Sequence, residues 1–284
     1  ADGIDVVLVC VKAYDCKSAA DELAAAMAPG VAAVSLLNGI GSEETLAEAL
    51  GRERVLAASL TTAVQKVEPG VVRVERERGL ALAAGHPFSP ELRKIFRRAG
   101  IETRLYARPE DFKWSKLLTN IVANATSAIL GWTAAQVMRH AGTFTLEVEA
   151  LREAVRVMRK LHRKPVNLPG APTAILGRGL FLPAGMVRPI LARIVGRGRG
   201  QKPPSLTLDI GRGRSEIYWL NAAVVEHGQG AGVNTPANQV LTSVFDGLVR
   251  GATPPESYRD KPERLLSEAA QAGVPGLERY NRPR

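Results

Sequence analysis

Runs of apolar residues in the first hundred positions predict a sheet with helices between its strands. Residues 6–11, VVLVCV, are apolar and mostly β-branched, which is typical of a strand buried on both faces of a parallel sheet. A segment with helical periodicity follows, and the alternation then continues. We expect helices over residues 18–27, 42–50 and 90–99, and strands over residues 31–37, 55–64 and 71–83. This order predicts an α/β domain.

From residue 109 onward the apolar residues recur with the period of a helix. We expect helices over residues 111–130, 133–140, 145–161, 184–195, 215–227 and 236–249. The last stretch is polar and contains prolines, with one short helix expected over residues 263–272. We therefore predict an α/β domain over residues 1–108, an all-helical domain over residues 109–251 and a polar tail over residues 252–284.

The composition is that of an ordinary folded protein, since 45% of the 284 residues are apolar and 23% are charged. No apolar run approaches the roughly 18 to 20 residues that cross a bilayer, and the first residues lack the basic start of a signal peptide. We therefore expect a cytoplasmic protein without membrane contact. Cys10 and Cys16 are the only cysteines, which excludes a disulfide framework and a cysteine-ligated zinc site. We expect no metal.

The formal net charge of +10 favours anionic partners. A carboxylate substrate or a phosphorylated cofactor satisfies this charge as well as nucleic acid does. Much of the excess lies in residues 152–164 and 188–202, where basic and apolar residues are interspersed. Such runs are more typical of solvated helix faces than of a nucleic-acid surface. We expect no nucleic-acid partner.

Lys116, Asn120 and Asn124 recur at intervals of four in an otherwise apolar segment. On one continuous helix they would form a single column about 12 Å long. Their apolar neighbours indicate a largely buried helix, in which an unpaired polar group costs about 1 to 3 kcal/mol. In one interpretation Lys116 extends to solvent and the asparagines cap neighbouring helix ends. We favour the other, in which the column contacts a ligand.

Polar residues also follow two predicted strands. Lys12 comes directly after the first strand, and Asn38 and Gly39 come directly after the second. In open α/β sheets, ligands bind at the carboxyl ends of strands, and glycine lets the backbone approach a ligand closely. An exposed lysine and an ordinary strand-to-helix turn explain the same residues, and position alone does not choose between these interpretations.

Ser205, Asp209 and Glu216 form a third polar set, which precedes an apolar helix. Ser215 is a favourable N-cap for that helix, and the helix dipole favours Glu216 in its first turn. Taken alone, this set is explained better by helix capping than by ligand binding.

Together and in order, these pieces resemble the ketopantoate reductase family, within the wider group of two-domain reductases related to 6-phosphogluconate dehydrogenase. The matching stretches are DVVLVCVKAY at residues 5–14, LNGIGSEETL at 37–46, WSKLLTNIVANATSAIL at 114–130 and SLTLDIGRGRSEIYWLN at 205–221. The resemblance implies a partial Rossmann-type dinucleotide-binding domain followed by an all-helical C-terminal domain. It also implies that the family's first strands and glycine loop, which cradle the cofactor pyrophosphate, lie outside this chain.

The resemblance implies reduction of ketopantoate (2-dehydropantoate) to pantoate with NADPH, a step of pantothenate and coenzyme A biosynthesis. It assigns general acid catalysis to Lys116 and substrate contacts to Asn120, Asn124, Ser205 and Glu216, with Glu216 at the hydroxyl end of the substrate. Hydride transfer to the keto carbon creates an alkoxide, which a lysine ammonium stabilises and protonates.

The resemblance also places Lys12, Asn38 and Gly39 near the nicotinamide end of the cofactor. The partners it implies are a small 2-keto acid and a second copy of the chain in a homodimer.

The chain departs from the family pattern in two further ways. The spacing from Ser205 to Glu216 is one residue shorter than expected, and Ala134 and Lys202 stand where polar substrate-binding residues are expected. The second of these departures leaves alternatives to ketopantoate. A paralogous reductase of another small 2-keto acid is therefore the first alternative. A catalytically silent binding or dimerisation module is the second, although the intact polar column containing Lys116 argues against it.

Overall fold

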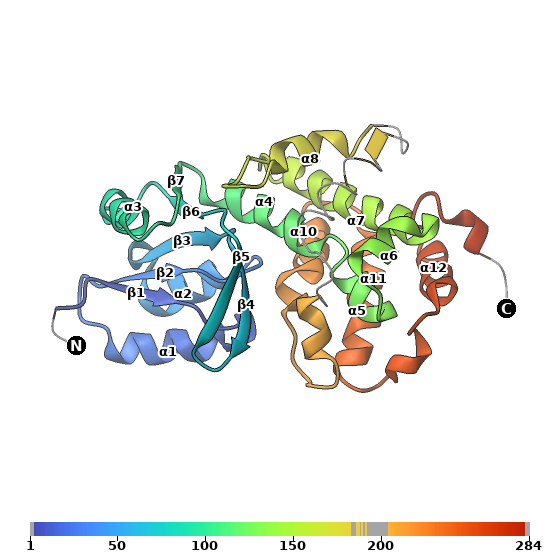
Figure 1. Cartoon of the computed structure of the whole chain (residues 1–284), viewed down its shortest axis with the longest axis horizontal. Coiled ribbons are helices and arrows are strands. Elements are labelled where there is room, and N and C mark those ends of the chain that lie inside the picture. Colours follow the sequence, from blue (N-terminus) through green and yellow to red (C-terminus); the bar gives the residue numbers. More distant parts are fainter. Residues whose placement is uncertain (1–2, 183–185, 188, 190, 192–203, 282–284) are drawn as a thin grey trace. The chain divides into compact units, whose positions relative to one another are not determined.

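The computed structural model of the chain describes residues 3–182, 186–187, 189, 191 and 204–281 (Figure 1). It divides into two compact units. Unit 1 comprises Ala1–Leu117 with Lys164–Ala174, and unit 2 comprises Leu118–Arg163 with Ile175–Arg284. The division falls within helix α4 (Pro109–Ile121). The domain boundaries at residues 108 and 251 stay predictions.

A five-stranded mixed sheet forms the centre of unit 1, in the order β1-β2-β3-β6-β7. Its strands are β1 (Val6–Val9), β2 (Ala32–Ser35), β3 (Val55–Leu60), β6 (Leu80–Ala83) and β7 (Thr103–Tyr106). The first three strands are parallel, β6 is antiparallel to β3, and β7 is parallel to β6. Helices α1 (Cys16–Ala26), α2 (Ser42–Leu50) and α3 (Ser89–Arg98) lie between strands in sequence, as expected. The sequence did not predict β7.

The chain leaves this sheet between β3 and β6. There, β4 (Ala63–Glu68) and β5 (Val71–Arg76) pair as a separate antiparallel hairpin. The Thr62 hydroxyl accepts a hydrogen bond from the Gly79 N–H at 3.0 Å, and Gly79 has a φ of +123°. These contacts close the corner where the chain re-enters the sheet. The strands predicted over 55–64 and 71–83 are therefore wrong in their bounds, because each joins a sheet strand to an exposed hairpin strand.

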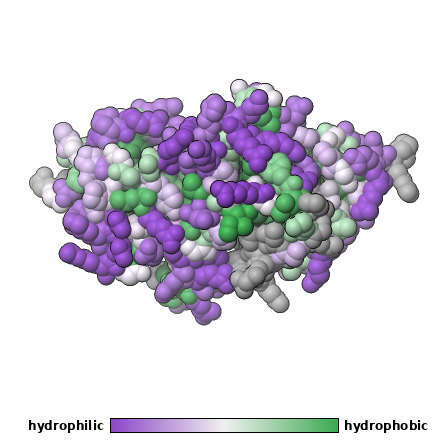
Figure 2. Space-filling model, turned by 90° about the horizontal axis from the view of Figure 1, so that it is seen from above, coloured by the Kyte–Doolittle hydropathy of each residue, from purple (hydrophilic) through white to green (hydrophobic). Residues whose placement is uncertain are grey.

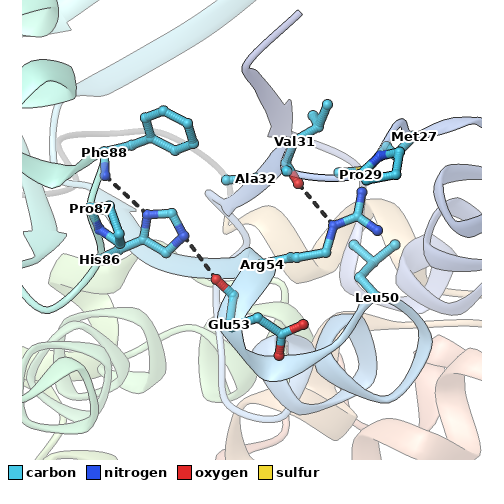
Figure 3. Close-up of a pocket in the computed structure, with 11 residues that line it drawn as sticks. Met27, Pro29, Val31, Ala32, Leu50, Glu53, Arg54, His86, Pro87 and Phe88 are labelled. Carbon is cyan, nitrogen blue, oxygen red and sulfur yellow. Dashed lines mark hydrogen bonds between the residues drawn. The ribbon is translucent and has the colours of Figure 1, made fainter.

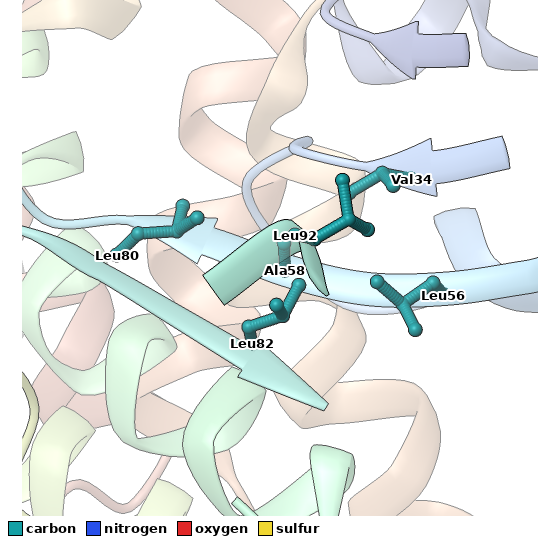
Figure 4. Packing of buried hydrophobic residues seen from close by; sticks show 6 residues of the cluster. All are labelled: Val34, Leu56, Ala58, Leu80, Leu82 and Leu92. Carbon is teal, nitrogen blue, oxygen red and sulfur yellow. The ribbon is translucent and has the colours of Figure 1, made fainter. Parts of the chain in front are cut away.

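The two faces of the sheet carry different side chains. One face packs on α3 through Val34, Leu56, Ala58, Leu80, Leu82 and Leu92 (Figure 4). On the other face Ala57, Ala81 and Ala83 pack with Leu168 and with Phe112 of α4. Successive residues of a strand point to opposite faces, so the alternation of leucine and alanine in β6 separates the two clusters. The alanines leave room for α4 to approach the sheet.

Unit 2 is helical. Its helices are α5 (Ala125–Leu130), α6 (Ala134–Arg139), α7 (Ala141–Lys160), α10 (Asn221–Gly230), α11 (Pro236–Val249) and α12 (Pro262–Gln271), and α8 (Thr173–Gly179) begins in unit 1. α7 packs against α6, α10, α11 and α12. It is therefore the central helix of this unit.

α7 buries carboxylates as well as apolar side chains. Glu153 is 1% exposed and accepts hydrogen bonds from the backbone N–H groups of Ala237 at 2.8 Å and Asn238 at 2.9 Å, in the first turn of α11. Burial raises the pKa of this carboxyl to about 7, against the opposing effect of those hydrogen bonds. Glu153 thus satisfies N–H groups that have no partner within α11 itself.

The segment expected as a polar tail contributes to unit 2. Its helix α12 matches the short helix predicted over residues 263–272, and Leu265, Leu266 and Leu277 are each 0% exposed.

The helix expected over residues 184–195 lies mostly outside the described residues, and Lys202 also lies outside them. The face seen in Figure 2 is mainly hydrophilic with smaller apolar areas. None of the described helices is long and apolar enough to cross a membrane.

Candidate active site

In unit 1 the predicted cofactor-binding residues lie at one edge of the sheet. β1 and β2 are parallel with Val9 opposite Ser35, so both strands end at the same edge. Lys12 follows β1 as an exposed residue, and Asn38 follows β2, also exposed. Gly39 is buried and has a φ of +86°, a conformation that suits glycine. A cation, an amide and a flexible backbone turn thus occupy the edge where α/β proteins bind ligands.

A buried ion pair joins α4 to this edge. The Lys113 ammonium lies 2.7 Å from the Glu43 carboxylate and donates a hydrogen bond to the Leu37 carbonyl, also at 2.7 Å. Glu43 accepts a second hydrogen bond from the Ser35 hydroxyl at 2.6 Å. Lys113 is 5% exposed and Glu43 is 9% exposed. The contact with Leu37 therefore holds α4 beside the turn that carries Asn38.

Sequence reasoning missed Lys113. The available signal was a lysine three residues before Lys116 in a mainly apolar helix. Residues three apart on a helix are neighbours on its surface, so Lys116 lies about one turn from the contact between Lys113 and Leu37. Lys116 is half-buried, and so is Asn120 one turn further along the same face of α4.

The helix ends before Asn124, so the prediction of one continuous helix over 111–130 is wrong. α4 stops at Ile121, Ala123 has a φ of +51°, and α5 starts at Ala125. The Ala123 N–H donates to the Glu147 carboxylate of α7 at 2.6 Å, and the Thr126 hydroxyl donates to the same carboxylate. This buried group stabilises the break, and Asn124 lies in the turn rather than in a column with Lys116.

The break brings two predicted substrate-binding residues together in unit 2. The Asn124 side-chain amide donates to the Ser205 hydroxyl at 3.4 Å, a long hydrogen bond. Asn124 is 3% exposed, and its side-chain oxygen has no hydrogen-bond partner among the described residues. An unpaired buried carbonyl oxygen is unfavourable, and a ligand hydroxyl would satisfy it. Ser205 is exposed, at the start of the 3-10 helix η3 (Ser205–Asp209).

Asp209, at the end of η3, positions Glu216. Its carboxylate accepts hydrogen bonds from the Ser215 hydroxyl at 2.9 Å and the Glu216 N–H at 3.2 Å. Ser215 in turn accepts from the Ile217 N–H at 3.1 Å, so it caps the following turn as expected. Glu216 is 9% exposed.

The single helix predicted over 215–227 is wrong. The segment forms a 3-10 turn, η4 (Glu216–Trp219), and then α10, with Leu220 outside helical geometry at φ −108° and ψ −100°. Glu216 is thus in a short turn fixed by Asp209 rather than in the first turn of a long helix.

The site residues therefore form two groups. Lys12, Asn38 and Gly39 share the sheet edge in unit 1, to which Lys113 ties the Lys116 segment of α4. In unit 2 Asn124 contacts Ser205, and Glu216 follows from the same η3 segment through Asp209. Within the described residues, no group of three or more His, Cys, Asp or Glu side chains is arranged to hold a metal ion.

A separate cavity of about 700 Å³ lies at the other edge of the sheet (Figure 3). It is lined by residues near the starts of β2 and β3, among them Val31 and Arg54, and by His86. Arg54 donates to the Val31 carbonyl at 3.0 Å, and His86 accepts at Nδ1 from the Phe88 N–H at 3.2 Å. Its Nε2 therefore carries the hydrogen and donates to the Glu53 carbonyl. These polar groups satisfy one another, and no predicted site residue lines this cavity.

Two family models match most of the chain. The model described as ketopantoate reductase PanE/ApbA matches residues 1–86, and the model of the ketopantoate reductase PanE/ApbA C terminal matches residues 110–249. The 2-dehydropantoate 2-reductase of Halobacterium salinarum is 29% identical over 84% of this chain and 74% of that protein. That of Pyrobaculum aerophilum is 28% identical over 86% of this chain and 77% of that protein.

The fold leads to the same group. The crystal structure of a PanE/ApbA family ketopantoate reductase from Ralstonia eutropha aligns with a TM-score of 0.72 at 28% identity, over 88% of this chain and 77% of that one. The chain thus has a Rossmann-type α/β unit followed by a helical unit, the architecture of two-domain reductases, and the predicted fold class is confirmed. The chain belongs to the ketopantoate reductase family, as the sequence motifs predict.

Proposed function

We propose that this chain reduces ketopantoate to pantoate with NADPH, a reaction of pantothenate and coenzyme A biosynthesis. Membership of the family supports the reaction class. The observation that carries the proposal to particular residues is the buried Lys113–Glu43 pair, which ties the Lys116 segment of α4 to the turn bearing Asn38. A candidate proton donor and a candidate cofactor contact thereby lie on two segments of unit 1 that Lys113 joins.

The residues at the sheet edge suit a nicotinamide cofactor. Lys12 offers a positive charge, Asn38 offers an amide, and the buried Gly39 at positive φ offers backbone without a side chain. We assign these three residues to the cofactor and its junction with the substrate. When bound, the reduced cofactor supplies the hydride that reduces the keto carbon of the substrate.

We assign the proton to Lys116. Its ammonium stabilises the negative charge that develops on the substrate oxygen and then donates a proton, which gives the hydroxyl of the 2-hydroxy acid product. Asn120, one turn away on the same half-buried face, orients the substrate beside it.

In unit 2 we assign substrate contacts to Asn124, Ser205 and Glu216. The unpaired side-chain oxygen of Asn124 accepts a hydrogen bond from a substrate hydroxyl, and Ser205 donates to or accepts from the same end. Glu216, held by Asp209, accepts a second hydrogen bond from that end. A second copy of the chain in a homodimer also belongs to this proposal.

NADPH oxidation, followed by absorbance with ketopantoate as substrate, tests the proposal. We expect turnover by the chain when it is joined to the family's first strands and glycine loop, and a fall in kcat of about 10² to 10⁴ when Lys116→Ala is made in that protein, the usual contribution of a general acid. Lys94→Ala, which removes an exposed lysine of α3, is the matched control and should retain wild-type kcat. Thermal unfolding of each variant shows that the fold is retained.

Other outcomes separate the alternatives. Activity with a different 2-keto acid, but none with ketopantoate, would retain the role of Lys116 and replace the substrate. A folded protein that turns over no 2-keto acid would contradict the proposal and favour the binding module.

A further inference from the structure

The basic run of α7 forms more than a solvated helix face. Arg152, the first residue of the basic run over 152–164, donates a hydrogen bond to the Leu180 carbonyl at 2.7 Å. It also forms an ion pair with Glu149 at 2.6 Å, so its side chain is already engaged. Three further cations, Arg156, Arg159 and Lys160, occupy the last turns of the helix. They line a surface cavity that includes none of the proposed site residues.

This cavity, the α7 hollow, has a volume of about 570 Å³. The other wall is the turn between α10 and α11, and the lining residues are Arg156, Arg159, Lys160, Gly232, Val233 and Asn234. Close packing fixes the turn: a Cβ at Gly228 would lie 2.8 Å from the Thr235 side chain and 3.3 Å from Val157 of α7. The Val233 N–H also donates to the Gly228 carbonyl at 2.8 Å. The two walls are therefore built against each other.

The lining carries three positive charges and no carboxylate. Arg156 lies 3.6 Å from Glu149, which is already engaged by Arg152. In the part of the chain that the structure describes, neither Arg159 nor Lys160 lies within ion-pair distance of a carboxylate. The C-terminal dipole of α7 favours cations in its last turn. The dipole does not explain why Arg159 and Lys160 line one cavity together with the α10–α11 turn.

Arg159 is held in place by an aromatic ring. Its guanidinium carbon lies 4.2 Å from the centre of the Phe181 ring, a cation–π contact that fixes the plane of the guanidinium group. The N–H groups at the edge of that plane stay available for a bidentate contact with an oxyanion. Asn234 adds an exposed amide from the opposite wall.

We propose that the α7 hollow binds a phosphate-bearing small molecule with at least two negative charges. Arg159 contacts a phosphate through its planar N–H groups, Lys160 supplies a second charge, and Asn234 donates from the turn. The volume lies within the range of about 300 to 1,000 Å³ that holds small ligands. A single nucleic-acid strand fits less well, because Arg159 covers the nearby Phe181 ring on which a base would stack.

Isothermal titration with inorganic pyrophosphate tests this site, and variants of α7 separate it from the proposed cofactor site, none of whose residues line the hollow. We expect saturable binding to the full chain. Arg159→Gln combined with Lys160→Gln should weaken it about tenfold or more, the scale of losing two charge-assisted contacts. Lys160→Gln alone, which breaks no described ion pair or ring contact, should weaken it without changing thermal stability.

The matched control is Arg93→Gln combined with Lys94→Gln, which removes the same two charges from exposed positions of α3 in unit 1. It should bind pyrophosphate like the wild-type chain. Equal losses in both double variants would show a general charge effect and overturn the proposal, as would the absence of saturable binding. Tighter binding of a single-stranded oligonucleotide than of pyrophosphate, lost in the α7 variant alone, would also overturn it and make the hollow part of a nucleic-acid surface.

Discussion

Lys113 places a full charge in the interior of unit 1. A buried ammonium loses its hydration, and the loss is offset only where partners replace the water. Here the Glu43 carboxylate and the Leu37 carbonyl both lie 2.7 Å away. With the hydrogen bond from the Ser35 hydroxyl to Glu43, these contacts join α4 to α2 and to the end of β2. This pair supports the proposed site without itself contacting a ligand.

We expect the pair to be strongly coupled. Lys113→Met leaves the Glu43 carboxylate buried without its cation, which should lower the free energy of unfolding by about 3 to 5 kcal/mol. Adding Glu43→Gln removes the stranded charge. The double variant should therefore lose less than the sum of the two single variants, by about 0.5 to 3 kcal/mol. Urea unfolding of all four proteins measures this coupling.

An exposed pair provides the comparison. Lys17 and Asp21 lie 2.5 Å apart, but their side chains are 70% and 55% exposed. Lys17→Met should cost less than about 1 kcal/mol. Additive losses at Lys113 and Glu43 would contradict the role assigned to that pair.

At the scale of elements, the sequence predicts those helices and strands that the residues within them determine. The apolar run 6–11 predicts β1 because its side chains are apolar on both faces. The break after Ile121 was missed because apolar residues continue through it. Its cause is Glu147, 24 residues away from Ala123. The contacts of Lys113 likewise involve residues far away in the sequence, Glu43 and Leu37. The sequence therefore identified Lys116 and Asn38 as candidates but not the contact that joins their segments.

The helix break itself is testable at Glu147. A glutamine there would present an amide N–H₂ to either the Ala123 N–H or the Thr126 hydroxyl, both of which are donors. One buried donor would lose its acceptor, which should destabilise the chain by about 1 to 3 kcal/mol. Under the proposed function, the displaced turn at Asn124 should also raise the KM for ketopantoate more than it lowers kcat. Urea unfolding and steady-state kinetics measure the two effects.

Glu226→Gln, at an exposed position of α10, is the control and should change neither quantity. Wild-type stability and wild-type KM in Glu147→Gln would show that the carboxylate does not hold the break.

At the scale of the whole molecule, the two units have separate interiors. Unit 1 is apolar on both faces of its sheet and buries the Lys113–Glu43 ion pair at one edge, whereas unit 2 buries carboxylates along α7, with Glu147 and Glu153 each 1% exposed. These groups hold the starts of α5 and α11 against the central helix. Stability of unit 2 therefore depends on the protonation of Glu153 in α7, whose pKa is raised by burial.

Glu153 determines the direction of that dependence. Burial raises its pKa from 4.5 to about 7, so between those values the folded state holds a proton that the unfolded state releases. Stability from this group is greatest below about pH 4.5, falls as the pH rises and levels off above about pH 7. The shift corresponds to about 3 kcal/mol across this range.

Glu153→Gln should remove this contribution, so the difference in unfolding free energy between wild type and variant should change by up to about 3 kcal/mol, in favour of the variant, from pH 4.5 to 7.5. A Trp114→Phe background makes fluorescence report unit 2, because Trp132 and Trp219 both belong to it. Urea unfolding at a series of pH values measures the difference. Glu226→Gln, which is exposed, should keep the wild-type slope. Parallel profiles for wild type and Glu153→Gln would mean that this carboxyl stays ionised in the fold, held by the N–H groups of α11.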